Sequence, residues 1–453
     1  MAKAAAVINQ DYLTHPDCKD VDHIPGTDGI PYFGSSLQTI WGLHDLINKH
    51  YDLWGDVSRI KLLYQRGVLV LGADNNQRIF LDTEKNLSTE MGFAESIGKF
   101  YKGGILMKDF EDHRVLRRMM QTAFKNAAMK QYVAMMNPII QSNIEPWDKL
   151  DNFLFFPRIK ETLLEIGAKV FIGVDLGEEA ELINKAFLAI NDGLLGMLRK
   201  EVPGTKYYRG KQGERFLRSY FANEIPKRRG SRSPDAFTYV CNEKDENGNY
   251  YPEELIIPQG SFLLFAAHDT TTSALNHIMY YTALNPEWQH AMREECRSLN
   301  KDYIDYEDLD KMEVVDRVLK ETLRMRPSVP FLARRTIKEC EISGHRIPAD
   351  TMIWVSPLQQ HHDPKFWTNP EQFDPDRFSP ERAEFKNHSF CYHPFGGGAH
   401  KCIGMHFAAM LTKTFMHQLL LKYEYSLPAD FKPRFEWVPL PKPAKLPIQW
   451  KRI

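Results

Sequence analysis

The feature of this sequence that most constrains its fold is a glycine-rich loop, Phe-Gly-Gly-Gly-Ala-His-Lys-Cys-Ile-Gly, from Phe395 to Gly404. Three consecutive glycines indicate backbone conformations closed to other residues, or a close approach to something flat and bulky. Good helix formers follow Gly404, so Cys402 is predicted to lie near a helix N-terminus, where the dipole and free amides favour a thiolate. A thiolate there can bind a metal ion, although most single cysteines are small buried hydrophobic residues.

Length, charge and cysteine usage narrow the class of protein. We expect one domain over residues 1–453 with a polar leader of about 1–24. With 58 basic and 59 acidic side chains, the net charge of -1 favours neither nucleic acid nor an anionic membrane. The six cysteines form no disulfide framework, which indicates a reducing compartment. No apolar run is long enough for a signal peptide or a membrane anchor, so we expect a cytoplasmic protein.

Hydrophobic periodicity and turn residues give a mostly helical chain. Helices are expected over 39–51, 160–172, 179–198 and 316–324 and after Gly404, and strands over 57–62 and 68–71 form a hairpin. Residues 76–106 show no clear periodicity and are interpreted as a partly buried loop. The adjacent His361 and His362 invite a metal interpretation, but neighbours on a strand cannot both face one site, so a loop with satisfied imidazoles is expected.

The glycine-rich loop fits the spacing Phe-x-x-Gly-x-x-x-Cys-x-Gly and resembles the haem-binding loop of the cytochrome P450 family. Three further motifs follow the family's order, and the resemblance covers roughly residues 20–450. It implies a cytochrome P450 fold, mainly α with a minor β-sheet region, forming one haem-thiolate catalytic domain. It also implies that the Cys402 thiolate binds the iron of haem b. Phe395, His400 and Gly404 would contact the cofactor, with His400 at a propionate.

The second motif is an apolar helical run over 261–275 whose middle turns small and hydroxylic. Asp and Thr are mediocre helix formers, and such side chains often bond back to the carbonyl four residues earlier. The resemblance implies instead that Asp269 and Thr270 are catalytic and deliver protons to dioxygen, with Ala266 close over the haem. Ala267 replaces the family's usual glycine. Pro258 could start or kink this helix.

Two groups of charged residues complete the motifs. His113 and Arg117 are four residues apart and share a helix face, which could be an ordinary solvated basic face. The resemblance implies that both, with Arg334, hold the haem propionates.

The other charged group contains Glu321 and Arg324, which are three residues apart and could form a weak surface pair. The resemblance implies that they form a structural triad with Arg377, behind the thiolate loop.

Aromatic and aliphatic residues near these motifs suggest a pocket for a hydrophobic small molecule, of the steroid, terpenoid or fatty acid class. By resemblance, the candidate pocket residues are Phe93, Phe100, Leu106, Phe262, Phe265, Val329 and Phe331.

The activity implied by the resemblance is a monooxygenase that activates dioxygen with two externally supplied electrons and hydroxylates a lipophilic molecule. Nothing in the 453 residues resembles a flavin or iron-sulfur domain, so NAD(P)H is expected to act indirectly, through a reductase and a ferredoxin or flavodoxin-type donor. Lys401, Arg118 and Lys125 would form a basic docking patch, or an ordinary solvated face.

Two alternatives belong to other classes. One is a haem-thiolate sensor without turnover, which the acid and alcohol pair argues against. The other is a binding module stapled by zinc through Cys391, His393, His400 and Cys402, whose spacing matches no paired-cysteine knuckle.

Overall fold

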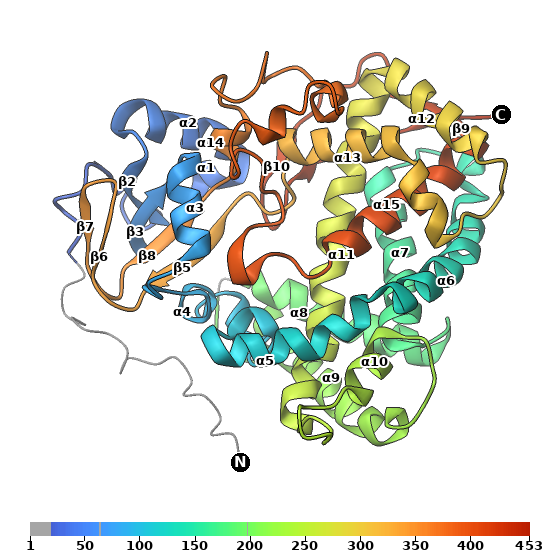
Figure 1. Cartoon of the computed structure of the whole chain (residues 1–453), viewed down its shortest axis with the longest axis horizontal. Coiled ribbons are helices and arrows are strands. Elements are labelled where there is room, and N and C mark those ends of the chain that lie inside the picture. The colour runs from blue at the N-terminus through green and yellow to red at the C-terminus, as the bar shows by residue number, and fades with distance from the viewer. Residues whose placement is uncertain (1–19, 63–64, 197) are drawn as a thin grey trace.

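The computed structural model describes residues 20–62, 65–196 and 198–453. Figure 1 shows a β-rich part, with strands in blue and orange, beside a larger helical part in which the yellow α11 and the red α15 lie centrally. The prediction of a mainly α fold with a minor β region is confirmed. The helices are α1 Ser36–Trp41, α2 Leu43–Trp54, α3 Ala73–Leu81, α4 Thr89–Phe93, α5 Phe110–Gln121, α6 Asn126–Ile144, α7 Phe155–Gly167, α8 Glu178–Leu194, α9 Lys206–Arg228, α10 Ala236–Asn242, α11 Glu253–Leu284, α12 Pro286–Ser298, α13 Glu313–Met325, α14 Leu358–His361 and α15 Met405–Lys422.

The main sheet has six strands in the order β1-β2-β3-β8-β5-β4. The predicted hairpin is confirmed, because β2 and β3 pair antiparallel with Val57 opposite Val70. Successive residues of a strand point to opposite faces. Accordingly Val68 packs into one buried cluster and Leu69 into another, so this part of the sheet is covered on both faces. The strands of this sheet are β1 Gly26–Thr27, β2 Val57–Leu62, β3 Gln65–Val70, β4 Leu87–Ser88, β5 Leu332–Thr336 and β8 Met352–Val355.

Three two-stranded sheets lie elsewhere. They pair β6 Cys340–Ile342 with β7 His345–Ile347, β9 Tyr423–Ser426 with β12 Gln449–Arg452, and β10 Phe435–Glu436 with β11 Lys442–Pro443.

Helix α11 runs through the helical core, packed against α7, α9, α13 and α15. It begins at Glu253 and contains Pro258, so this proline does not start the helix. A proline removes the hydrogen bond to the carbonyl four residues earlier. Here that carbonyl belongs to Glu254, an exposed residue in the first helical turn, where water can satisfy it. No helix in the described ranges is both long enough and apolar enough to span a bilayer.

Two expectations about local structure are wrong. The helix predicted over 39–51 is two helices, because Gly42 adopts φ -148° and ψ 48°, outside the helical region. The predicted loop over 76–106 contains α3, α4 and short helical turns, and the Ser88 side chain caps α4 by accepting a hydrogen bond from the Met91 amide. Most of the predicted polar leader, residues 1–19, lies outside the described residues, whereas Val21 and Ile24 are buried.

Candidate functional site

The glycine-rich loop before α15 packs against the end of α3. The Cys402 amide donates a hydrogen bond to the Phe395 carbonyl at 2.9 Å, which closes the loop. Gly396 and Gly398 have φ of +69° and +61°, conformations that favour glycine. A Cβ on Gly398 would lie 1.8 Å from the Phe80 carbonyl oxygen. The close approach of α3 therefore requires glycine at position 398. The loop also has the predicted backbone conformations that other residues rarely adopt.

The Cys402 side chain is accessible to solvent, although protein surrounds the sulfur on most sides. Burial raises the pKa of the Cys402 thiol, and the Gly404 amide, Arg117 and Lys401 offset burial only in part. Helix α15 begins at Met405, so the sulfur lies two residues before the N-cap. The predicted position near a helix N-terminus is confirmed, but burial opposes the favourable effect of the Gly404 amide on the thiolate. A bound metal cation would supply further stabilisation of the thiolate.

Basic side chains of α5 lie beside this loop. Arg117 donates a hydrogen bond to the Lys401 carbonyl at 2.5 Å. The rings of His113 and His400 are 3.9 Å apart, centroid to centroid. His400 also contacts the Asp109 carboxylate, with Nε2 at 3.4 Å from Oδ1. The structure therefore brings His113, Arg117 and His400 to one place.

Arg334, on β5, is a buried cation. It is 5% exposed, and its guanidinium donates a hydrogen bond to the Ala333 carbonyl at 2.8 Å. The guanidinium lies 5.5 Å from the ring centroid of Phe80, and burial lowers the pKa of Arg334 to about 10. No carboxylate in the described part of the chain forms an ion pair with it. An unpaired buried charge is unfavourable, so this side chain is suited to an anionic ligand.

On α11, the Thr270 hydroxyl donates to the Ala266 carbonyl at 2.8 Å. This bond to the carbonyl four residues earlier is one alternative that the sequence suggested for the hydroxylic side chains. Thr272 makes the equivalent bond to the His268 carbonyl. Ala266 is exposed although most of α11 is buried. Ala267 instead packs among residues of α7 and α15, so the two alanines do not face the same space.

The Asp269 carboxylate is held by three polar side chains. Its Oδ1 accepts from His268 at 2.9 Å and lies 3.7 Å from the Lys160 ammonium, while Oδ2 accepts from Asn191 at 3.1 Å. Burial raises the pKa of Asp269, but His268 and Lys160 outweigh burial and hold it below its ordinary value. Sequence reasoning missed all three partners. Only His268 had a local signal, as a histidine in an apolar helical run.

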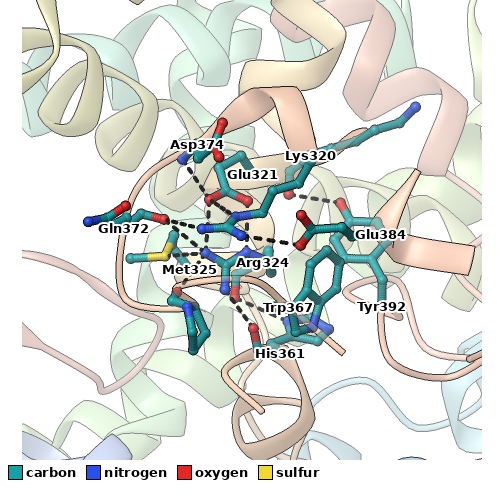
Figure 2. A network of polar contacts seen from close by, with 12 residues as sticks. Lys320, Glu321, Arg324, Met325, His361, Trp367, Gln372, Asp374, Glu384 and Tyr392 are labelled. Carbon is teal, nitrogen blue, oxygen red and sulfur yellow. Dashed lines mark hydrogen bonds and ion pairs between the residues drawn. The ribbon is translucent and has the colours of Figure 1, made fainter. Parts of the chain in front are cut away.

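Glu321 and Arg324 lie in a buried network (Figure 2), and Arg377 also pairs with Glu321. Arg324 donates to both carboxylate oxygens of Glu321, at 2.7 and 2.8 Å, and Arg377 donates to Glu321 at 3.3 Å. All three side chains are at most 1% exposed, so the alternative of a weak surface pair is wrong. Arg324 also donates to the backbone carbonyls of His361 and Pro370, which joins α13 to two later segments.

The candidate pocket residues do not form one group. Phe262 and Phe265 lie together with Tyr101, with ring centroids 4.4 to 6.2 Å apart. Phe100 is buried between α8 and α9, with its ring 5.1 Å from that of Tyr207 and against Gly193 and Gly210. The remaining candidates are all half-buried. Phe93 and Phe331 pack against one cluster beside the sheet, Leu106 packs against the helical core, and Val329 precedes β5.

The zinc alternative finds no support in the described ranges, because Cys391, His393, His400 and Cys402 do not converge on one point. The Cys391 thiol faces the Phe385 carbonyl at 3.4 Å, and His400 pairs with Asp109.

The basic residues near the loop are exposed. Lys401 and Lys125 lie at the surface, as does Arg118, which forms an ion pair with Glu246.

Comparison with known proteins gives one family. The family model "Cytochrome P450" matches residues 24–448. The "Putative cytochrome P450 136" of Mycobacterium tuberculosis is 33% identical over 426 residues, covering 93% of this chain and 86% of that protein. The "Putative cytochrome P450 120" of Synechocystis is 26% identical and covers 92% and 94%. A solved structure, "Retinoic acid bound cyanobacterial CYP120A1", aligns with a TM-score of 0.82, 24% identity and coverage of 95% and 99%, which shows the fold.

The residues present fit haem b, the cofactor of this family. An accessible thiol, Cys402, is available as an iron ligand, and Arg334 is a buried cation suited to a carboxylate such as a haem propionate. The chain therefore belongs to the cytochrome P450 family of haem-thiolate monooxygenases, which use dioxygen and electrons from NAD(P)H delivered by partner proteins.

Proposed function

We propose that this monooxygenase hydroxylates a lipophilic small molecule of the steroid, terpenoid or fatty acid class, with a terpenoid as the first candidate. The aromatic group of Tyr101 with Phe262 and Phe265 of α11 supports an apolar substrate. Relatives 26% identical to this chain include a "Taxoid 14-beta-hydroxylase" of Taxus cuspidata and a "Beta-amyrin 28-monooxygenase" of Vitis vinifera. These names favour a polycyclic terpenoid over a fatty acid.

Residues on both sides of the proposed cofactor position would hold haem b. The Cys402 sulfur would bind the iron, and His113, Arg117, Arg334 and His400 would bind the propionates as donors. Phe395, Gly404 and Ala266 would line the cofactor. Bound there, haem supplies the activation of dioxygen. The observation that carries this assignment is the accessible Cys402 thiol in a loop with the cationic Arg117 beside it.

Asp269 and Thr270 would move the proton that the reaction consumes. Asp269 is ionised and lies between His268 and Lys160, which can pass a proton to its carboxylate. The Thr270 hydroxyl donates its hydrogen to the Ala266 carbonyl, so its oxygen keeps lone pairs to accept one. The Glu321, Arg324 and Arg377 network would be structural and hold the segments behind the Cys402 loop.

A ferredoxin or flavodoxin-type donor, with its reductase, would dock on the exposed basic residues Lys401, Lys125 and Arg118. Because such contacts are screened by ions, electron transfer should slow as salt rises. Lys401→Glu should slow reduction more than Lys49→Glu, at an exposed position on α2, does. Equal rates in both variants would contradict this docking face.

The substrate proposal is tested by titrating holoenzyme with panels of terpenoids, steroids and fatty acids while recording the Soret band. A polycyclic terpenoid should displace the iron-bound water and be hydroxylated when NAD(P)H and a surrogate reductase system are supplied. If only fatty acids shift the band, the terpenoid choice is wrong. If ligands bind but no product forms with any donor system, the sensor alternative is favoured.

A further inference from the structure

A second cluster of potential ligands contains no residue of the Cys402 loop. It contains His44 from the first turn of α2, His362 directly after α14, and Glu371 from the following loop. One ligand atom from each residue lies within 4.8 Å of the other two. The rings of His44 and His362 are 4.4 Å apart, centroid to centroid. Three segments distant in sequence therefore bring two imidazoles and a carboxylate to one point.

The hydrogen bonds of His362 show which of its nitrogens faces the cluster. Its Nε2 lies 3.2 Å from the Met325 carbonyl oxygen, which can only accept, so Nε2 carries a hydrogen. Its Nδ1 lies 2.9 Å from Oε1 of Glu371. A carboxylate also only accepts, so either Nδ1 carries a second hydrogen or both atoms share a cation. A metal-binding histidine usually donates its other N–H to a carbonyl or carboxylate, as His362 does to Met325.

His44 provides an independent observation. Its Nε2 is buried and has no hydrogen-bond partner in the described part of the chain. A buried polar atom without a partner is unfavourable, and in native structures it often marks an absent ion or water. The adjacent residue His361 does not join the cluster, because its ring contacts the Arg324 carbonyl and accepts from the His393 amide.

We propose that His44, His362 and Glu371 bind a divalent transition-metal ion, best fitted by Zn²⁺. Two imidazole nitrogens and one carboxylate are a known ligand set for zinc, and water would take the fourth position. The Glu371 side chain is 70% exposed, which gives the ion a route from solvent. The bound ion would tie α2 to the segments that Arg324 also holds through the His361 and Pro370 carbonyls. The bound zinc would have a structural role, and its binding would not depend on substrate.

The test uses holoenzyme treated with a chelator, desalted and then titrated with ZnCl₂ by calorimetry. Elemental analysis should find one zinc per chain beside the haem iron, and X-ray absorption at the zinc edge should show nitrogen and oxygen ligands at about 2.0–2.1 Å. His44→Gln and Glu371→Gln should each weaken zinc binding by at least about tenfold. His290→Gln, an exposed histidine on α12, should bind zinc like the wild type.

Two results would overturn the proposal. The first is a wild type that takes up no zinc, which would leave His362 and Glu371 as a simple ion pair. The second is equal zinc binding by the wild type and both variants, which would place the metal elsewhere. The Soret band and far-ultraviolet circular dichroism check that the variants fold. Glu371→Gln changes an exposed side chain, so it keeps the test valid if His44→Gln does not fold.

Discussion

At the scale of single residues, Asp269 shows how tertiary contacts tune a side chain. Its carboxylate is partly buried, yet His268 and Lys160 hold its pKa below the ordinary value, and Asn191 donates a hydrogen bond to it. The acid itself was found from its place in α11. Lys160 and Asn191 could not be found, because they come from α7 and α8 and have no local pattern that sets them apart from solvated residues. Likewise, the resemblance could single out Arg334 by its position after Pro330, but it could not show that this side chain has no ion-pair partner among the described residues.

Replacing Asp269 should impair proton delivery. We expect Asp269→Asn to lower product formation by about 100-fold, since the amide cannot carry a proton and general acid–base catalysis contributes this much or more. Haem content should be unchanged. The measurement is turnover with a saturating electron donor. The matched control is Asp192→Asn, an exposed neighbour of Asn191, which should behave like the wild type. Unchanged turnover in Asp269→Asn would remove Asp269 from the proposed relay.

At the scale of elements, a buried ion network joins helix α13 to later segments of the chain. The period of apolar residues predicted a helix over 316–324, and α13 spans Glu313–Met325. The prediction of one helix over 39–51 was wrong because Gly42 interrupts it. The sequence could not show this, since a single glycine inside a helical pattern is often tolerated. The spacing of Glu321 and Arg324 could not predict their burial, because residues three apart on a helix also form exposed surface pairs. Only the contacts with later segments reveal it.

Breaking this network should destabilise the protein strongly. Removing one partner of a buried pair leaves an uncompensated charge, so Arg324→Ala should cost about 3–5 kcal/mol in the free energy of unfolding. Arg297→Ala is the matched control. Arg297 pairs with Glu294 at the same spacing and at 2.8 Å, but about half exposed, so its loss should cost less than about 1 kcal/mol. Denaturant unfolding measures both. Similar costs would show that burial of the network is not what matters.

The packing of the Cys402 loop on α3 gives a second prediction at this scale. Gly398→Ala should lower haem retention and stability, because the new Cβ would meet the Phe80 carbonyl at 1.8 Å. Gly248→Ala has a similar positive φ of +80° but no atom within 4 Å of the new Cβ. Gly248→Ala should therefore lower the free energy of unfolding only by the backbone strain, about 1 kcal/mol. Absorbance of bound haem after heating compares the two. Equal loss in both variants would show that the approach to α3 is unimportant.

At the scale of the whole molecule, the order of the motifs was enough to predict the fold class and the family. The pocket residues stay a prediction. Phe100, one of the candidates, is buried between α8 and α9, because Gly193 and Gly210 let these helices pack closely around its ring. Which aromatic residue faces a ligand depends on how helices pack, and spacing along the chain does not determine that.

Stability should depend on pH through Glu90 of α4. Burial raises the pKa of Glu90 to about 7. In the unfolded chain this carboxyl loses its proton near its ordinary pKa of about 4.3, so the folded state binds more protons between about pH 4 and 7. Stability is therefore lost as pH rises through this window. Glu90→Gln should stabilise the protein at pH 8 by about 1–2 kcal/mol, reduced by solvent screening, and much less at pH 4.

The measurement is the unfolding free energy of Glu90→Gln and wild type across this pH range. Exposed Glu287→Gln is the control and should show no such pH-dependent difference. A stabilisation by Glu90→Gln that is equal at pH 4 and pH 8 would rule out titration of Glu90 as the cause.

The central claim is that the Cys402 sulfur binds the haem iron as a thiolate, and the absorption spectrum of the reduced carbon monoxide complex tests it most directly. The wild type should show the red-shifted Soret maximum of thiolate ligation, Cys402→Ser should lose it, and Cys391→Ser, a buried neighbour in sequence, should keep it. A wild-type maximum typical of histidine ligation, or a thiolate signature that survives in Cys402→Ser, would contradict the account.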